Sequence, residues 1–301
     1  MIDRRVFVAG ASLSGFFLSS NSLNSSKPLL LRTVPSSGEN IPAIGMGSWL
    51  TFDVGNDPEA LIVRTEILRT FLQCGGRLID SSPMYGTSQS VIGTALAKLN
   101  NTKSVFAADK VWTSGKEQGL RQIRESVAKW RFPKMDLLQI HNLVDWETQL
   151  ETLFEMKEVG RLRYVGITSY DGLRYDQLEH IMTRHPIDFV QFSYNIADRR
   201  AEERLFPIAK ERGISVIINR PFQEGRLTRN VVERSLPSSA KEIKSESWAQ
   251  YLLQWIVSNP TVTATIPATS RVDHMRENIG VLHKPIPDAN LRERMARDFM
   301  A

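Results

Sequence analysis

The sequence alternates, eight times in succession, between a short apolar stretch with strand character and a longer stretch with helical periodicity. The short stretches are rich in branched residues, as buried parallel strands are. Between them, apolar residues recur every three or four positions, which predicts amphipathic helices such as Ser88 to Lys98 and Glu117 to Trp130. The predicted strands cover residues 44–48, 77–80, 105–110, 136–141, 162–167, 188–191, 214–218 and 261–266.

Eight strand-helix pairs predict an α/β fold, the (β/α)8 TIM barrel, which typically needs about 250 residues and has its active site where the strands end. Residues 29–301 are expected to form this one domain. The segment Leu29 to Pro42, with Pro35-Ser-Ser-Gly38 between two apolar runs, predicts a hairpin that plugs the barrel bottom. Asp288 to Met300 predicts an extra C-terminal amphipathic helix.

The composition is that of a globular protein and gives no sign of nucleic-acid binding. Hydrophobic residues make up 42% and charged residues 24% of the chain, which are ordinary values for a packed domain. The net charge is +5, and the basic residues are scattered over predicted helix faces without interleaved aromatics, so no nucleic-acid partner is expected. The sequence also lacks a metal-ligand cluster and a Gly-x-Gly-x-x-Gly fingerprint.

The first 28 residues have the features of an export signal. Arg4-Arg5 precedes an apolar run from Val6 to Leu18, which resembles a twin-arginine signal. The expected partner is the twin-arginine export machinery, and the expected location is periplasmic or extracytoplasmic, or cytoplasmic if the signal is not functional. A buried N-terminal helix is the alternative, because no Ala-x-Ala cleavage site is evident. No later segment has the length of a membrane span, so no stable membrane insertion is expected after signal removal.

Four polar residues close predicted strands or open the loops that follow them: Asp80, Tyr85, Lys110 and His141. A carbonyl that accepts hydride develops negative charge on its oxygen, which needs a proton. Tyr85 is expected to be the acid, with Lys110 lowering the pKa of its phenol from about 10. Asp80 is expected to pair with Lys110, and His141 to orient the carbonyl. Each residue alone could be structural, but together they predict a carbonyl reductase.

With these residues the chain resembles the aldo-keto reductase family over nearly its whole length after residue 28. Leu78-Ile-Asp-Ser-Ser-Pro-Met-Tyr-Gly86 is similar to the family's Asp-Thr-Ala-x-x-Tyr-Gly box. The resemblance implies NADPH as cofactor, with Thr168, Ser169 and Gln191 at the nicotinamide amide. Asn219 stands where many members have a stacking aromatic, so the stack is either absent or supplied by Phe222 or another loop residue.

The resemblance also implies a site for the cofactor's phosphates and adenosine. Its predicted residues are Thr269, Ser270 and Arg271, with Glu277 and Asn278 at the adenine and Gly225 at the pyrophosphate. A guanidinium makes charge-assisted bonds to a 2′-phosphate, so Arg271 favours NADPH over NADH. Alternatively, Arg271 merely decorates the start of the last barrel helix.

The substrate is the least specified part of the prediction. Trp49, Trp112 and Trp146 follow the first, third and fourth strands and could wall an apolar pocket for an aldehyde or ketone, or could be packing residues. A different class of function also stays open: a cofactor-binding redox sensor or scaffold with little turnover. The departure at Asn219 and the expected export favour that alternative.

Overall fold

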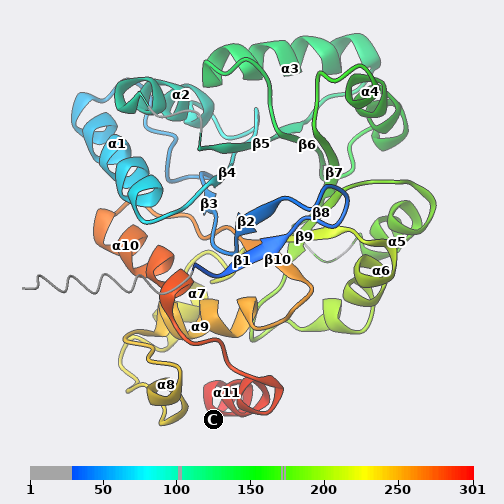
Figure 1. The fold of residues 1–301 in the computed structure, drawn as a ribbon. Coiled ribbons are helices and arrows are strands. Elements are labelled where there is room, and N and C mark those ends of the chain that lie inside the picture. Colours follow the sequence, from blue (N-terminus) through cyan, green and yellow to red (C-terminus); the bar gives the residue numbers. More distant parts are fainter. Residues whose placement is uncertain (1–28, 101–103, 171, 173) are drawn as a thin grey trace, which may run out of the picture.

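The protein is a closed parallel barrel surrounded by helices (Figure 1). The computed structural model describes residues 29–301 except 101–103, 171 and 173, so the predicted export signal lies outside the described residues. The eight strands are hydrogen-bonded in sequence order. Gly45 N donates to Thr265 O at 2.8 Å, and bridges join Ile44 to Thr265 and Gly47 to Ala268, which brings the last strand beside the first. The strands are β3 (Met46–Gly47), β4 (Leu78–Asp80), β5 (Phe106–Val111), β6 (Leu137–His141), β7 (Tyr164–Thr168), β8 (Phe189–Ser193), β9 (Ser215–Asn219) and β10 (Val262–Thr265).

A helix follows each strand on the outside of the barrel, which confirms the predicted (β/α)8 fold. The main helices are α1 (Pro58–Gln73), α2 (Ser88–Leu99), α3 (Lys116–Trp130), α4 (Trp146–Glu158), α5 (Tyr175–Arg184), α6 (Leu205–Arg212), α9 (Trp248–Val257) and α10 (Val272–Gly280). The sequence did not predict four shorter pieces, because helices this short lack a full period of apolar residues. They are α7 (Arg226–Asn230), α8 (Ser239–Glu242) and the 3-10 turns η1 (Arg200–Glu202) and η2 (Val281–His283).

A hairpin closes one end of the barrel, as predicted. Its strands β1 (Leu31–Thr33) and β2 (Asn40–Pro42) are antiparallel. Val34 and Ile41 are fully buried in a cluster that also contains Leu78, Phe106 and Phe189 from the barrel interior. The apolar plug leaves the opposite end, where the strands finish, as the place for polar chemistry.

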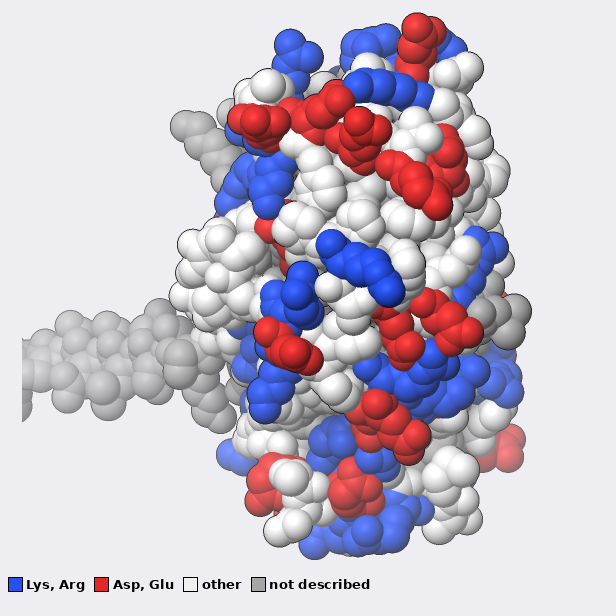
Figure 2. Space-filling model, turned by 90° about the vertical axis from the view of Figure 1, so that its right-hand side faces the viewer, with Lys and Arg blue, Asp and Glu red and all other residues white. Residues whose placement is uncertain are grey.

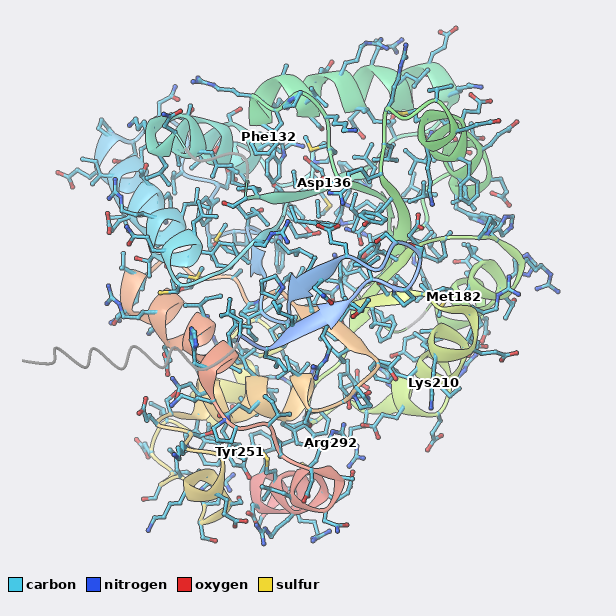
Figure 3. All side chains as sticks on the ribbon, viewed as in Figure 1. Phe132, Asp136, Met182, Lys210, Tyr251 and Arg292 are labelled. Atoms are coloured by element: carbon cyan, nitrogen blue, oxygen red, sulfur yellow. The ribbon has the colours of Figure 1, made fainter. Side chains whose placement is uncertain are left out.

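The predicted C-terminal helix is α11 (Ala289–Met300), and it packs beside α9 (Figure 3). Asp288 caps it by accepting a hydrogen bond from Leu291 N at 2.8 Å. Trp255 Nε1 donates to Arg292 O at 3.1 Å, and Tyr251 OH donates to Met295 O at 3.2 Å. These contacts satisfy buried polar groups and attach α11 to the barrel.

The barrel interior changes from apolar to polar along the strands. In β5, Phe106 and Ala108 belong to the inner apolar cluster, and Lys110, two residues further, faces the same interior because side chains alternate along a strand. Outside, Lys and Arg are interspersed with Asp and Glu on the face shown in Figure 2. Within the described residues, no helix is long and apolar enough to cross a membrane.

Candidate active site

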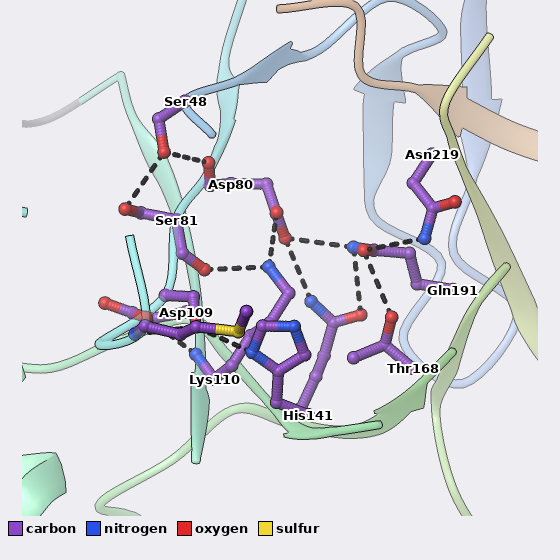
Figure 4. A network of polar contacts seen from close by, with 12 residues as sticks. Ser48, Asp80, Ser81, Asp109, Lys110, His141, Thr168, Gln191 and Asn219 are labelled. Atoms are coloured by element: carbon purple, nitrogen blue, oxygen red, sulfur yellow. Dashed lines mark hydrogen bonds and ion pairs between the residues drawn. The ribbon is translucent and has the colours of Figure 1, made fainter. Parts of the chain in front are cut away.

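A buried ion pair lies at the open end of the barrel. Lys110, at the end of β5, is paired through Nζ with Asp80 Oδ1 at the end of β4 and also donates to Ser81 O at 2.7 Å (Figure 4). The two side chains are only 1% and 2% exposed. Burial opposes the charge on Lys110, but Asp80 and Tyr85 outweigh it and raise the pKa of Lys110 above its usual value. The ammonium therefore stays charged beneath the mouth.

Tyr85, in the loop after β4, is half-buried between this ion pair and His141. Lys110 Nζ lies 5.2 Å from the centroid of its ring, and the His141 ring stands edge-on to it at 5.7 Å. Burial raises the pKa of the Tyr85 phenol, Lys110 counteracts it, and Asp80 adds to the rise. The net direction is opposite to the one predicted from the sequence, because burial outweighs the ammonium. At neutral pH the phenol keeps the proton that a general acid must donate.

His141, at the end of β6, is held in one orientation by Ser82. Its Nδ1 lies 2.7 Å from Ser82 Oγ, and the same Oγ accepts a hydrogen bond from Met84 N at 3.3 Å. Burial first, and Lys110 second, lower the pKa of His141 to about 3, so the imidazole is neutral at physiological pH. Where the Ser82 hydroxyl donates to Nδ1, the hydrogen of the ring sits on Nε2, which can donate to a carbonyl oxygen.

A network of three amides and a hydroxyl continues from Asp80 across four further strands (Figure 4). Asp80 Oδ2 accepts hydrogen bonds from Gln139 Nε2 and Gln191 Nε2, both at 3.0 Å. Gln191 Oε1 accepts from Thr168 Oγ1 at 3.2 Å and from Asn219 Nδ2 at 3.3 Å. Gln191, which the sequence assigned to the nicotinamide, thus uses its amide to hold Asp80 and its neighbours.

This constellation of a phenol, a buried ammonium, a carboxylate and a neutral imidazole suits proton donation to an oxygen that gains negative charge. The sequence model of the Aldo/keto reductase family matches residues 43–294. The chain belongs to the aldo/keto reductase family. Membership makes it an oxidoreductase of carbonyl compounds and confirms the resemblance seen in the sequence.

Relatives and structural neighbours agree with this assignment. Methylglyoxal reductase YeaE of Escherichia coli is 26% identical over 84% of this chain and 89% of its own length. The NADH-specific methylglyoxal reductase of the same organism is 25% identical, over 82% and 91%. The holo form of aldo-keto reductase AKR11C1 from Bacillus halodurans has a TM-score of 0.75 at 21% identity, covering 90% of this chain and 96% of its own. An aldo/keto reductase from Klebsiella pneumoniae in complex with NADP and acetate has 0.74 at 22%, covering 89% and 95%.

The nicotinamide end of a family cofactor fits the oxygens that remain at the mouth. Asn219 Nδ2 donates to Ser169 O at 3.1 Å, and Asn219 Oδ1 accepts from Ser193 Oγ at 2.7 Å. Thr168 Oγ1 is only a donor among the described contacts. A carbonyl or hydroxyl oxygen has two lone pairs, so Thr168 and Asn219 each keep acceptor capacity for the amide hydrogens of a carboxamide.

The loops after β9 and β10 are where TIM barrels commonly bind phosphate. Gly225, with φ of +80°, directly precedes the short helix α7, and its conformation favours glycine. Thr269 is buried and its Oγ1 accepts a hydrogen bond from Arg271 N at 3.1 Å. Exposed Arg271 is paired with Asp273 through two hydrogen bonds. A guanidinium and a hydroxyl are donors that suit a phosphate, which would compete with Asp273 for Arg271.

The remaining predicted cofactor residues differ in their positions. Ser270 is exposed beside Arg271, and its carbonyl accepts from Arg64 Nη1 at 3.4 Å. Glu277 is half-buried, and its carbonyl accepts from Gln250 Nε2 at 3.3 Å. Asn278 is 3% exposed on α10. Phe222 is half-buried and packs against the main core.

The three tryptophans predicted to line the substrate pocket do not lie at one site. The Trp112 ring lies 6.5 Å from His141 and is 43% exposed. Trp49, after β3, is 37% exposed. Trp146 begins α4 and packs edge-on to His180 and His185, at 6.0 and 5.5 Å. Since those histidines belong to α5 and its end, Trp146 lines a groove on the outside of the barrel, and only Trp49 and Trp112 remain as pocket candidates.

Several site residues were not singled out from the sequence. Ser82 fixes the histidine, Ser81 supplies a carbonyl to Lys110, and Gln139 supports Asp80. Strand alternation could have indicated Gln139, because it lies two residues before His141 and so shares its face. The two serines lie within the quoted box, but nothing in their spacing told which atoms they contact.

Proposed function

We propose that this protein reduces an aldehyde or ketone with hydride from NADPH, with Tyr85 as the general acid. The observation that carries the proposal is the buried pair of Lys110 and Asp80 beneath the phenol, beside a neutral His141. A buried ion pair with further hydrogen bonds to Ser81 and two glutamines is more elaborate than packing requires. Such preorganised groups commonly mark sites where charge develops during a reaction.

The proton moves from Tyr85 to the substrate. NADPH, when bound, supplies the hydride that adds to the carbonyl carbon. The carbonyl oxygen takes the phenolic proton of Tyr85, and the resulting phenolate is stabilised by the Lys110 ammonium, 5.2 Å from the ring centroid. Asp80 holds that ammonium in place. His141 Nε2 orients the carbonyl oxygen, because Ser82 fixes its ring.

NADPH is proposed as cofactor because the loops after β9 and β10 fit its phosphates and because a structural neighbour is described as a complex with NADP. Arg271 would hold the 2′-phosphate, and Thr168 and Asn219 the carboxamide. Fluorescence titration with NADPH and NADH tests this assignment directly. Tighter binding of NADPH, lost in Arg271→Ala, is the expected result, whereas equal affinities would remove the role of Arg271.

The substrate is proposed to be a carbonyl compound with an apolar body. Trp49, Leu50, Met84 and Trp112 are exposed large apolar residues on loops after β3, β4 and β5. Methylglyoxal belongs in the assay panel because two relatives are named for it. We expect Trp112→Ala to raise KM for an aromatic aldehyde, with Trp146→Ala as the matched control that leaves KM unchanged. Equal effects of both changes would place the pocket elsewhere.

A redox sensor or scaffold is the second candidate, and Asn219 favours it. An asparagine offers no aromatic surface to a nicotinamide, and the amide of Asn219 is bonded to Ser169 and Gln191. A sensor would bind NADPH and pass its hydride to one equivalent of a carbonyl compound without multiple turnovers. Steady turnover on any aldehyde in the panel excludes this candidate.

Export by the twin-arginine route is proposed on the sequence of residues 1–28 alone. The full chain should reach the periplasm of an expressing bacterium, and changing Arg4-Arg5 to Lys-Lys should retain it in the cytoplasm. An identical distribution of the two chains would contradict this route.

The decisive test of the reductase proposal is carbonyl-dependent oxidation of NADPH by the wild type and Tyr85→Phe. The variant removes only the hydroxyl and so keeps the ring against His141. The wild type should turn over and the variant should not, and equal rates would remove Tyr85 as the acid.

A further inference from the structure

A second buried carboxylate lies behind the site, on the outer face of β5. Asp109 is 0% exposed and directly precedes Lys110. Its Oδ2 accepts hydrogen bonds from Gln89 Nε2 at 2.8 Å and from Trp130 Nε1 at 2.6 Å. Its Oδ1 accepts from Lys110 N at 2.7 Å. Gln89 belongs to α2 and Trp130 to α3, so the carboxylate joins two helices to the strand at the residue before Lys110.

Among the described residues, no Lys or Arg side chain donates a hydrogen bond to the Asp109 carboxylate. The groups that contact Asp109 from α2 and α3 are the uncharged side chains of Gln89 and Trp130. Gln89 Nε2 also donates to Ser126 Oγ at 2.9 Å. The charge of Asp109 raises the pKa of Lys110 and of Tyr85. Asp80 lies on the other side of the Lys110 ammonium. One ammonium thus faces two buried carboxylates from opposite sides of β5.

The cluster also contains an acceptor that a protonated Asp109 could use. Gln89 Oε1 is buried and has no hydrogen-bond partner among the described residues. Rotation of the Gln89 amide would turn this acceptor toward Asp109, where it could accept a hydrogen bond from a protonated carboxyl. Burial raises the pKa of Asp109 to about 6, against the opposing hydrogen bond from Lys110 N and the Lys110 charge.

We propose that Asp109 is a positioning residue, which locks the end of β5 to α2 and α3 and whose proton occupancy sets the net charge around Lys110 and Tyr85. The sign follows from Coulomb interactions. When Asp109 is ionised, its negative charge offsets part of the Lys110 field and keeps the phenol a weaker acid. When it is protonated, that opposition disappears. Under the proposed function, on which this catalytic consequence rests, carbonyl reduction accelerates as pH falls through about 6.

The direct readout is the titration of Tyr85, followed by the ultraviolet difference spectrum of the phenolate, with Tyr85→Phe identifying its contribution. Asp109→Asn removes the charge, and it should lower the titration midpoint of Tyr85 by about one pH unit. Ser126→Ala is the matched control, since it loosens Gln89 in the same cluster and leaves the charge. It should leave the midpoint unchanged. An unchanged midpoint in folded Asp109→Asn, or equal shifts in both variants, overturns the proposal.

Trp130→Phe provides a second variant if Asp109→Asn does not fold. It removes one donor to the carboxylate, so Asp109 should hold its proton to higher pH, and the step in kcat/KM near pH 6 should move upward. A step that does not move overturns the proposal. The titration of Tyr85 in Asp109→Asn and Ser126→Ala needs no substrate. A protein without turnover would therefore contradict the proposed function and leave the titration as a test of Asp109.

Discussion

Substitutions in the ion pair between Asp80 and Lys110 should affect stability and activity differently. Lys110→Met removes the ammonium but keeps most of the side-chain volume. Asp80, 2% exposed, then becomes a buried carboxylate without its cation. Breaking a buried pair in this way commonly costs about 3–5 kcal/mol of unfolding free energy. The rate of carbonyl reduction should fall by at least about 10², because the phenolate loses its stabilising charge.

A second substitution, Asp80→Asn in the Lys110→Met background, should restore much of the stability. The Asn carbonyl can accept from Gln139 and Gln191, as Asp80 Oδ2 does at 3.0 Å. Ser81 O still loses the 2.7 Å bond from Lys110, but the amide carries no charge that needs a cation. Without a buried charge, we expect the double variant to lie within about 2 kcal/mol of the wild type, while its activity stays lost.

Urea unfolding followed by circular dichroism measures the four free energies, those of the wild type, Lys110→Met, Asp80→Asn and the double variant, and NADPH oxidation measures the rates. The coupling energy of the double-mutant cycle should then be about 2 kcal/mol or more. The reasoning is refuted if Lys110→Met costs under about 1 kcal/mol, or if the double variant is destabilised by the sum of both changes. Activity in the double variant would refute the catalytic part.

Three further predictions concern His141 and the phosphate loops. Ser82→Ala removes the 2.7 Å contact to His141, a loss of about 0.5–1.5 kcal/mol, so kcat/KM should fall about three- to tenfold with little loss of fold; an unchanged kcat/KM would contradict the role of Ser82. Asp273→Asn frees Arg271 from its ion pair, and NADPH should bind about threefold tighter while NADH does not; unchanged NADPH affinity in a fluorescence titration would argue against Arg271 as the phosphate ligand. The pKa of His141 falls from 6.5 to about 3, so the folded state binds fewer protons than the unfolded state. The stability of the wild type relative to His141→Gln should therefore decline as pH drops below 6.5, by about 2 kcal/mol at pH 5 in urea unfolding. A pH-independent difference would mean that His141 is not buried as a neutral ring.

The fold was predictable because its signals are local and repeated. The eight predicted strands overlap the observed ones, and the hairpin and the last helix were indicated by a turn sequence and an amphipathic period. The failures were of two kinds. Short helices such as α7 carry too few residues to show a period, and Trp146 follows a barrel strand but turns toward His185 outside the barrel. The position of Trp146 in the sequence indicates which loop it follows, but not the direction in which its ring points.

The site was predictable in its residues and less so in its electrostatics. Asp80 and Lys110 pair as expected, because strand ends bring distant residues to one edge of the sheet. The direction of the pKa shift of Tyr85 was not predictable, because burial and the effect of Asp109 depend on packing that spacing does not encode. Spacing also did not indicate that the amide of Gln191, which was predicted at the nicotinamide, holds Asp80.

The central claim is that Tyr85 gives its proton to a carbonyl while hydride arrives from NADPH. The most direct measurement follows nicotinamide absorbance with NADPH bound and an aldehyde in excess, in the wild type and in Tyr85→Phe. We predict that the wild type oxidises many equivalents, and that the variant binds NADPH equally well but reacts at least about 10² more slowly. Equal rates in the two proteins, or a wild type that stops after one equivalent, would contradict the claim.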